Sequence, residues 1–171
     1  MKKHILKVWM ILAISFLAMD VVGQESYTAG YPNVDGVGQE TATLNVSATV
    51  GGTETTMVTI PGGPTFPYTY ATHQAKYVTL LHTDPQPSKE NVINWSSDGN
   101  SGSISEGLYG SINLWSANSE FSSSILNLQP STNYVIYIVT VDVSGNNVIQ
   151  TEMDSNSPTL VSFTTSAPPL L

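Results

Sequence analysis

Apolar and polar residues alternate along several segments of the chain, and this alternation predicts β-strands. In residues 41–50 the apolar side chains recur at every second position: Ala42, Leu44, Val46, Ala48 and Val50. A period of two places all of them on one face of a half-buried strand. The pair Gly51-Gly52 follows and predicts a hairpin turn, with residues 55–60 as the returning strand.

The second half of the chain carries the longest apolar strand. Residues 134–141 are apolar on both faces, which predicts a central strand that is covered on both sides. Turn-forming residues precede it at 130–133 and follow it at 144–147. Residues 159–165 predict a last strand, after which two consecutive prolines break regular structure.

The middle of the chain, residues 65–120, is less regular. Within it, 77–81 predicts a strand or a short helix, and 92–95 and 110–115 predict strands. Loops rich in Gly, Ser, Asp and Asn separate them. There is no convincing repeat and no long amphipathic helix. The whole pattern predicts an all-β sandwich with an extended middle segment.

A more specific motif lies just before the central strand. Its spacing is Leu128-x-Pro130-x-Thr132-x-Tyr134, which fits a tyrosine corner, where a tyrosine at the start of a strand hydrogen-bonds back across the preceding turn. Together with the strand that follows, this motif resembles the corner between strands E and F of a fibronectin type III domain. The resemblance implies an immunoglobulin-like β-sandwich, with residues 41–60 as strands B and C.

The chain departs from the family pattern in two places. Strand B lacks the tryptophan that is usual in the family, so Leu44 or Val46 must fill that core position. Such domains have about 100 residues, so the segment 65–120 must hold additional loops or strands. The resemblance implies a module of bacterial secreted or cell-surface proteins.

The N-terminus predicts an export signal. Three lysines precede an apolar run of about a dozen residues, the length of a signal-peptide core and short for a membrane span. We expect cleavage after Gly23, which leaves a domain at 24–166 and a linker or tail at 167–171. An uncleaved N-terminal anchor is the alternative. The expected location is secreted or at the cell surface, or else the periplasm, with no stable membrane insertion after cleavage.

Removal of the signal makes the chain strongly acidic. Two lysines and no arginine remain against twelve carboxylates, a net charge of about −10. Such a chain repels phosphate backbones and anionic membranes, so we expect no nucleic-acid partner. The sequence contains no cysteine, so the core alone must hold the exported domain together.

We expect no catalytic residue, no metal site and no cofactor. His73 and His82 would need a third ligand such as Asp84 to hold a metal, and surface positions are the favoured interpretation. No serine lies in a nucleophile elbow. Asp98, in a Gly- and Asn-containing stretch, offers oxygen atoms to Ca²⁺, but a plain turn is favoured there.

The aromatic residues of the middle segment are the feature that points to a ligand. Trp95, Trp115 and Tyr109 are the candidate ligand-binding residues, because exposed rings beside Asn and Asp stack on sugars; packing in the core is the competing and favoured role. We therefore expect a non-catalytic module with a structural, spacer or adhesion role, and protein or polysaccharide at the cell surface as its partner. The alternatives are a carbohydrate-binding module and an accessory domain of a larger secreted enzyme.

Overall fold

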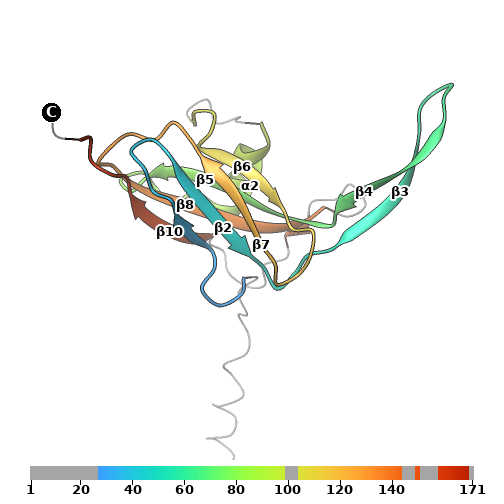
Figure 1. Cartoon of the computed structure of the whole chain (residues 1–171), viewed down its shortest axis with the longest axis horizontal. Coiled ribbons are helices and arrows are strands. Elements are labelled where there is room, and N and C mark those ends of the chain that lie inside the picture. The colour runs from blue at the N-terminus through green and yellow to red at the C-terminus, as the bar shows by residue number, and fades with distance from the viewer. Residues whose placement is uncertain (1–26, 99–103, 144–148, 151–157, 170–171) are drawn as a thin grey trace, which may run out of the picture.

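The computed structural model describes residues 27–98, 104–143, 149–150 and 158–169 (Figure 1). The predicted signal peptide and its cleavage site lie outside these residues. The strands are β1 (Asn33–Asp35), β2 (Ala42–Ser47), β3 (Thr53–Thr59), β4 (Thr65–Ala71), β5 (His73–Leu81), β6 (Tyr109–Asn113), β7 (Glu120–Ile125), β8 (Asn133–Asp142), β9 (Ile149–Gln150) and β10 (Thr159–Thr164). The helix is α2 (Lys89–Asp98). Within the described ranges, no helix has both the length and the apolar character needed to cross a membrane.

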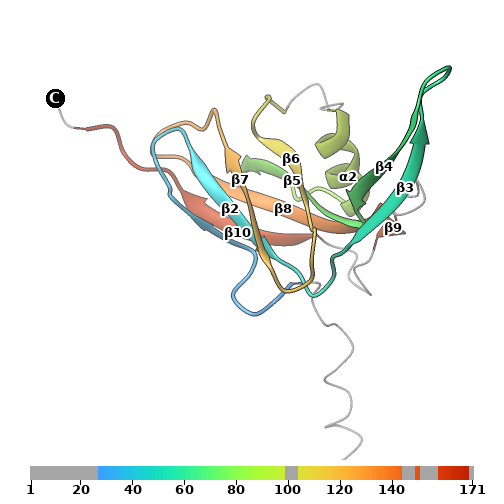
Figure 2. The same cartoon turned by 45° about the vertical axis from the view of Figure 1, so that its right-hand side comes forward.

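The protein is an all-β sandwich of antiparallel sheets, as the alternation predicts. One sheet has the order β1-β2-β7, and the other has the order β10-β8-β5-β6. Strand β9 pairs with the C-terminal end of β8. Strand β8 pairs with β5 on one side and β10 on the other, so the predicted central strand is central. Figures 1 and 2 show the two sheets stacked face to face.

The main core lies between the two sheets. Leu44 and Val46 of β2 face Ile136 and Ile138 of β8, and all four side chains are fully buried. Burial of each such side chain stabilises the fold by roughly 1.5–3 kcal/mol relative to exposure. Leu44 and Val46 are therefore both part of the main core.

A second core lies on the outer face of the larger sheet, where α2 covers it (Figure 2). Val92 of the helix is fully buried against Val78 of β5 and Val139 of β8. The prediction of a strand at 92–95 is therefore wrong. A short apolar run fits a strand and a buried helix equally well. The deciding signal is Ser88, whose hydroxyl accepts a hydrogen bond from the backbone N–H of Asn91 (3.1 Å) and caps the helix.

The returning strand predicted at 55–60 does not join the sandwich. Strand β3 pairs with β4 instead, and the two project from the body as a two-stranded arm (Figure 1). The turn of this hairpin lies at 60–64, where the N–H of Gly63 donates to the carbonyl of Ile60 (2.8 Å). Every side chain of β3 is exposed. Its Thr-rich sequence offers no apolar face that a sandwich core could bury.

The motif at 128–134 forms the turn into β8. The hydroxyl of Tyr134 accepts a hydrogen bond from the backbone N–H of Gln129 (2.9 Å), back across the turn. Leu128 is buried, and the hydroxyl of Thr132 donates to the carbonyl of Pro130 (2.9 Å). The Tyr134 ring packs nearly parallel to Phe163 of β10, with centroids 5.7 Å apart. The corner therefore ties β8 to both the turn and the neighbouring strand.

Candidate binding cleft at the base of the arm

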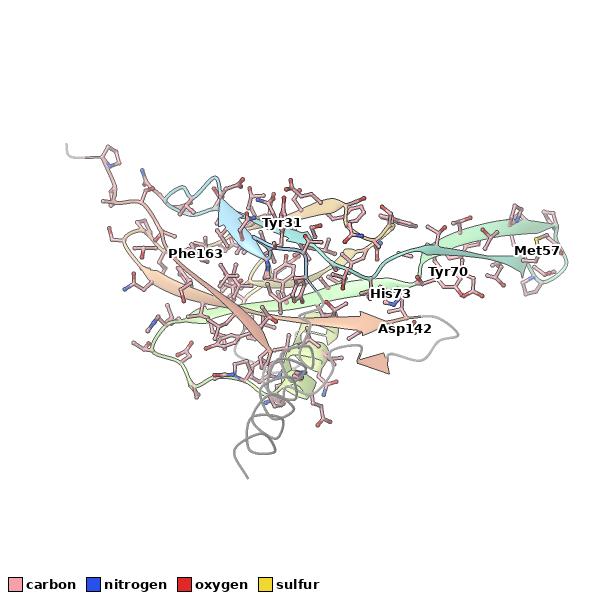
Figure 3. All side chains as sticks on the ribbon, turned by 90° about the horizontal axis from the view of Figure 1, so that it is seen from below. Tyr31, Met57, Tyr70, His73, Asp142 and Phe163 are labelled. Carbon is pink, nitrogen blue, oxygen red and sulfur yellow. The ribbon has the colours of Figure 1, made fainter. Side chains whose placement is uncertain are left out.

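An open cleft of about 600 Å³ lies where the arm meets the larger sheet. Its walls come from β3, β4, β5 and the end of β6, together with residues that directly follow β6 and β8. The lining side chains that carry aromatic rings, a carboxylate or an amide are Glu54, Tyr68, Tyr70, Gln74, Asn113 and Trp115. Its volume falls within the range of roughly 300–1,000 Å³ that small-molecule sites occupy. Figure 3 shows Tyr70 near the base of the arm and Met57 near its tip.

Backbone hydrogen bonds fix the base of the arm to the sandwich. The N–H of Gly52, just before β3, donates to the carbonyl of Leu114 (3.0 Å), and the N–H of Thr72, just after β4, donates to the carbonyl of Gly52 (3.0 Å). The N–H of Val143 in turn donates to the carbonyl of Thr72 (2.8 Å). The arm, the exit of β6 and the exit of β8 are thus held in one arrangement, and the cleft between them is preformed.

A glycine allows the closest of these approaches. A Cβ atom on Gly51 would lie 2.6 Å from the carbonyl carbon of Ser116 and 2.9 Å from the backbone nitrogen of Ala117. Both contacts are with backbone, which cannot rotate away as a side chain can. The absence of a side chain at 51 therefore lets the strand into the arm run directly beside the segment that carries Trp115.

The two faces of the arm differ in character. Directly opposed residues of an antiparallel pair share a face. On one face, threonines pair across the strands, with hydroxyls 2.8 Å apart at Thr55–Thr69 and at Thr59–Thr65. On the other face, Val58 lies opposite Phe66, and the pairs Thr56–Tyr68 and Glu54–Tyr70 follow toward the base. This second face, called here the aromatic face, runs down the arm into the cleft.

The aromatic rings of the cleft are accessible. The rings of Tyr68 and Tyr70 lie nearly parallel, 21° apart, with centroids separated by 6.2 Å. Tyr68 is 54% exposed and Trp115 is 42% exposed. The hydroxyl of Tyr70 donates to Oε2 of Glu54 (2.7 Å), which fixes both side chains at the edge of the cleft. The cleft therefore presents exposed rings at positions that the backbone holds in place.

Two amide side chains form part of the sheet wall. Gln74 of β5 and Asn113 of β6 are directly paired in the sheet, and Nε2 of Gln74 donates to Oδ1 of Asn113 (2.8 Å). An amide has two donor hydrogens and a carbonyl oxygen with two lone pairs. This mutual bond uses one donor and one lone pair, so the amides retain capacity to donate to and accept from a ligand.

The cleft carries little charge on a protein whose net charge is negative. The two lysines that follow the predicted signal, Lys76 and Lys89, are only 8% and 7% exposed. Glu54 is the one charged residue among the described residues that line the cleft. The cleft is therefore nearly neutral inside and surrounded by a molecule of negative charge.

The tyrosines whose pKa is raised lie outside the cleft. Burial raises the pKa of Tyr77 above its usual value of 10.0, and a hydrogen bond to Ser123 partly opposes this change. A hydrogen bond to Glu120 raises the pKa of Tyr31, at the exposed rim of the smaller sheet. Burial raises the pKa of Tyr137, with a smaller contribution from the charge of Asp84. These hydroxyls stay protonated at neutral pH.

The candidate ligand-binding residues of the sequence analysis divide between two places. Trp115 lines the cleft. Trp95 of α2 and Tyr109 of β6 pack against the second core and do not line the cleft, so the structure does not bring the three together. The tyrosines of β4 join Trp115 instead. The signal for them is the spacing Tyr68-x-Tyr70, which places both rings on one face of a strand.

The residues weighed as metal ligands are far apart. His73 begins β5 and His82 follows its last residue, so the strand separates them by roughly 30 Å at about 3.3 Å per residue. Asp98 is the last residue of α2, and the two residues after it lie outside the described part of the chain. Among residues 27–98, 104–143, 149–150 and 158–169, no group of three or more His, Asp or Glu is placed to hold a metal ion.

Comparisons with known proteins add no identity to this geometry. No protein-family model, no curated protein and no solved structure matches the chain.

Proposed function

We propose that the chain is a non-catalytic, exported β-sandwich module that acts by contact at the cell surface, in an adhesive or structural role. The observation that carries this proposal is the arm, a two-stranded hairpin with an exposed aromatic face. An isolated hairpin is marginally stable at best in water. Apolar and aromatic side chains on such an element gain stability when a partner covers them.

The proposal includes an immunoglobulin-like sandwich of the fibronectin type III kind. The sheet orders β1-β2-β7 and β10-β8-β5-β6 correspond to strands A-B-E and G-F-C-C′. The hydrogen bond of Tyr134 at the start of β8 supports the assignment of β8 as strand F. On this assignment the arm is an insertion between strands B and C, and α2 is an insertion between C and C′.

The arm differs from the rest of the module in the exposure and the charge of its side chains. Val58 and Phe66 lie opposite each other on the aromatic face and are 36% and 40% exposed. Between 53 and 71 the only charged side chain is Glu54, so the arm presents a nearly uncharged surface on an acidic protein. An acidic partner would be repelled by the negative charge of the rest of the module, and contact through the nearly uncharged arm reduces this repulsion.

Cell attachment tests this role. The protein, produced from the full-length gene with a C-terminal epitope tag, is added to washed cells of the producing organism, and the bound fraction is measured by flow cytometry. The double variant Val58→Ser/Phe66→Ser should reduce the bound fraction several-fold. Met57→Ser is the matched control, because Met57 is 62% exposed on the opposite face of the same strand. Equal retention of the double variant and the control would refute an adhesive arm.

A further inference from the structure

We infer that the cleft at the base of the arm binds a neutral polysaccharide chain. This inference rests on the proposed function, because it takes the cleft to be the part of the contact surface that recognises a defined ligand. The argument has three parts: the exposure of the rings, the hydrogen-bonding groups between them, and the charge of the surroundings.

The rings suit the faces of sugars. A pyranose ring presents a flat face of C–H groups, which packs against the negative face of an aromatic ring. Trp115 and Tyr68 are accessible from the cleft, and Tyr68 and Tyr70 lie nearly parallel along one strand. Rings on two separate walls engage more than one sugar unit at once, which favours a chain over a single sugar.

The polar groups suit hydroxyls. Each sugar hydroxyl both donates and accepts; a side-chain amide can bond to it in either way, and an ionised carboxylate accepts from it. Gln74 and Asn113 lie side by side on the sheet wall, and Glu54 lies on the arm wall with its carboxylate held by Tyr70. In small-molecule sites a few polar groups among apolar and aromatic side chains fix the orientation of the ligand, and this open cleft of about 600 Å³ has that composition.

Charge selects a neutral ligand. The lining holds one carboxylate and, among its described residues, no cation. The lysines beyond the predicted signal are nearly buried, so an anionic polysaccharide finds no exposed partner and meets a repulsive field. A cationic peptide would need several carboxylates at the site, and Glu54 alone, already engaged by Tyr70, does not supply them.

Affinity electrophoresis measures this binding directly. The protein from the full-length gene is run through native gels that contain soluble neutral polysaccharides built from glucose, xylose, mannose or galactose, and through gels that contain anionic polygalacturonate. We expect retardation by at least one neutral polysaccharide and none by polygalacturonate. Trp115→Ala should weaken the apparent affinity by at least about tenfold, because it removes a ring that packs on the sugar face. Trp115→Phe should retain part of it.

Leu160→Ala is the matched control, because Leu160 is 52% exposed on β10 and lies outside the cleft. A Trp95→Phe variant gives a second readout, since the Trp115 emission should then shift when a neutral polysaccharide is added. No shift with any neutral polysaccharide, retardation that survives Trp115→Ala, or binding to polygalacturonate alone would each overturn the inference. If cell attachment depends on Val58 and Phe66 while no neutral polysaccharide binds, the sugar inference fails and the proposed function stands.

Discussion

The tyrosine at the start of β8 offers the most direct test of what holds the sandwich together. Tyr134 is 4% exposed, and its hydroxyl accepts the backbone N–H of Gln129 at 2.9 Å. Tyr134→Phe keeps the ring and removes the acceptor, so a part-buried N–H loses its partner at a cost of roughly 1–2 kcal/mol. Tyr134→Ala also removes the ring that packs on Phe163 and leaves a cavity, at a cost of roughly 3–5 kcal/mol.

Both losses are large against a total stability of roughly 5–15 kcal/mol. Urea unfolding followed by circular dichroism measures them as changes in midpoint at constant slope. Tyr68→Phe is the control, since the same atom is removed from a side chain that is 54% exposed and the change should stay within about 0.5 kcal/mol. If the Tyr134→Phe and Tyr68→Phe curves coincide, the hydrogen bond across the turn contributes nothing measurable and the reasoning fails.

Three further predictions follow from other parts of the molecule. Gly51→Ala should destabilise the protein by roughly 1–3 kcal/mol in the same urea assay, because the added Cβ would lie 2.6 Å from backbone. Gly52→Ala, whose Cβ would have its nearest contact at 3.3 Å, should cost less, and equal effects would contradict the close approach at Gly51. The stability that protonated Tyr77 contributes is fully present below its unfolded pKa near 10.0, and it is lost as the pH rises through the raised pKa of the folded state. Tyr77→Phe should therefore flatten the decline of the urea midpoint above about pH 10, and an unchanged slope would contradict this role of Tyr77. Intact-mass measurement of the exported protein should show loss of about the first 23 residues, and a product that retains the N-terminal lysines would refute the predicted signal.

Some of the fold could be predicted from local pattern alone. The strands predicted at 134–141 and 159–165 correspond to β8 and β10 to within one residue at each end, because a long apolar run and a turn motif specify them within a few neighbouring residues. The arm was not predicted. Its strands carry mostly Thr, and the choice between pairing with the preceding strand and pairing with the following one depends on tertiary contacts such as that of Gly52 with Leu114.

The candidate site shows the same division more sharply. The sequence makes Trp115 a candidate for stacking on a ligand, but it does not indicate whether the ring is exposed. Tryptophan is used both in cores and at binding surfaces, and the local sequence does not distinguish the two. Gln74 and Asn113 are 39 positions apart in the chain and are joined only by the pairing of β5 with β6. Residues whose proximity depends on sheet register leave no local signal in the sequence.

The burial of Lys76 and Lys89 has a consequence for resistance to proteolysis. Beyond residue 23 the chain offers a trypsin-like protease only two bonds, those after Lys76 and Lys89, because it contains no arginine. Lys76 lies within β5, between two paired neighbours, and Lys89 is the first residue of the helix that covers the outer face. Cleavage at either bond requires the fold to open locally, so resistance to a trypsin-like protease depends on the opening free energy of the larger sheet.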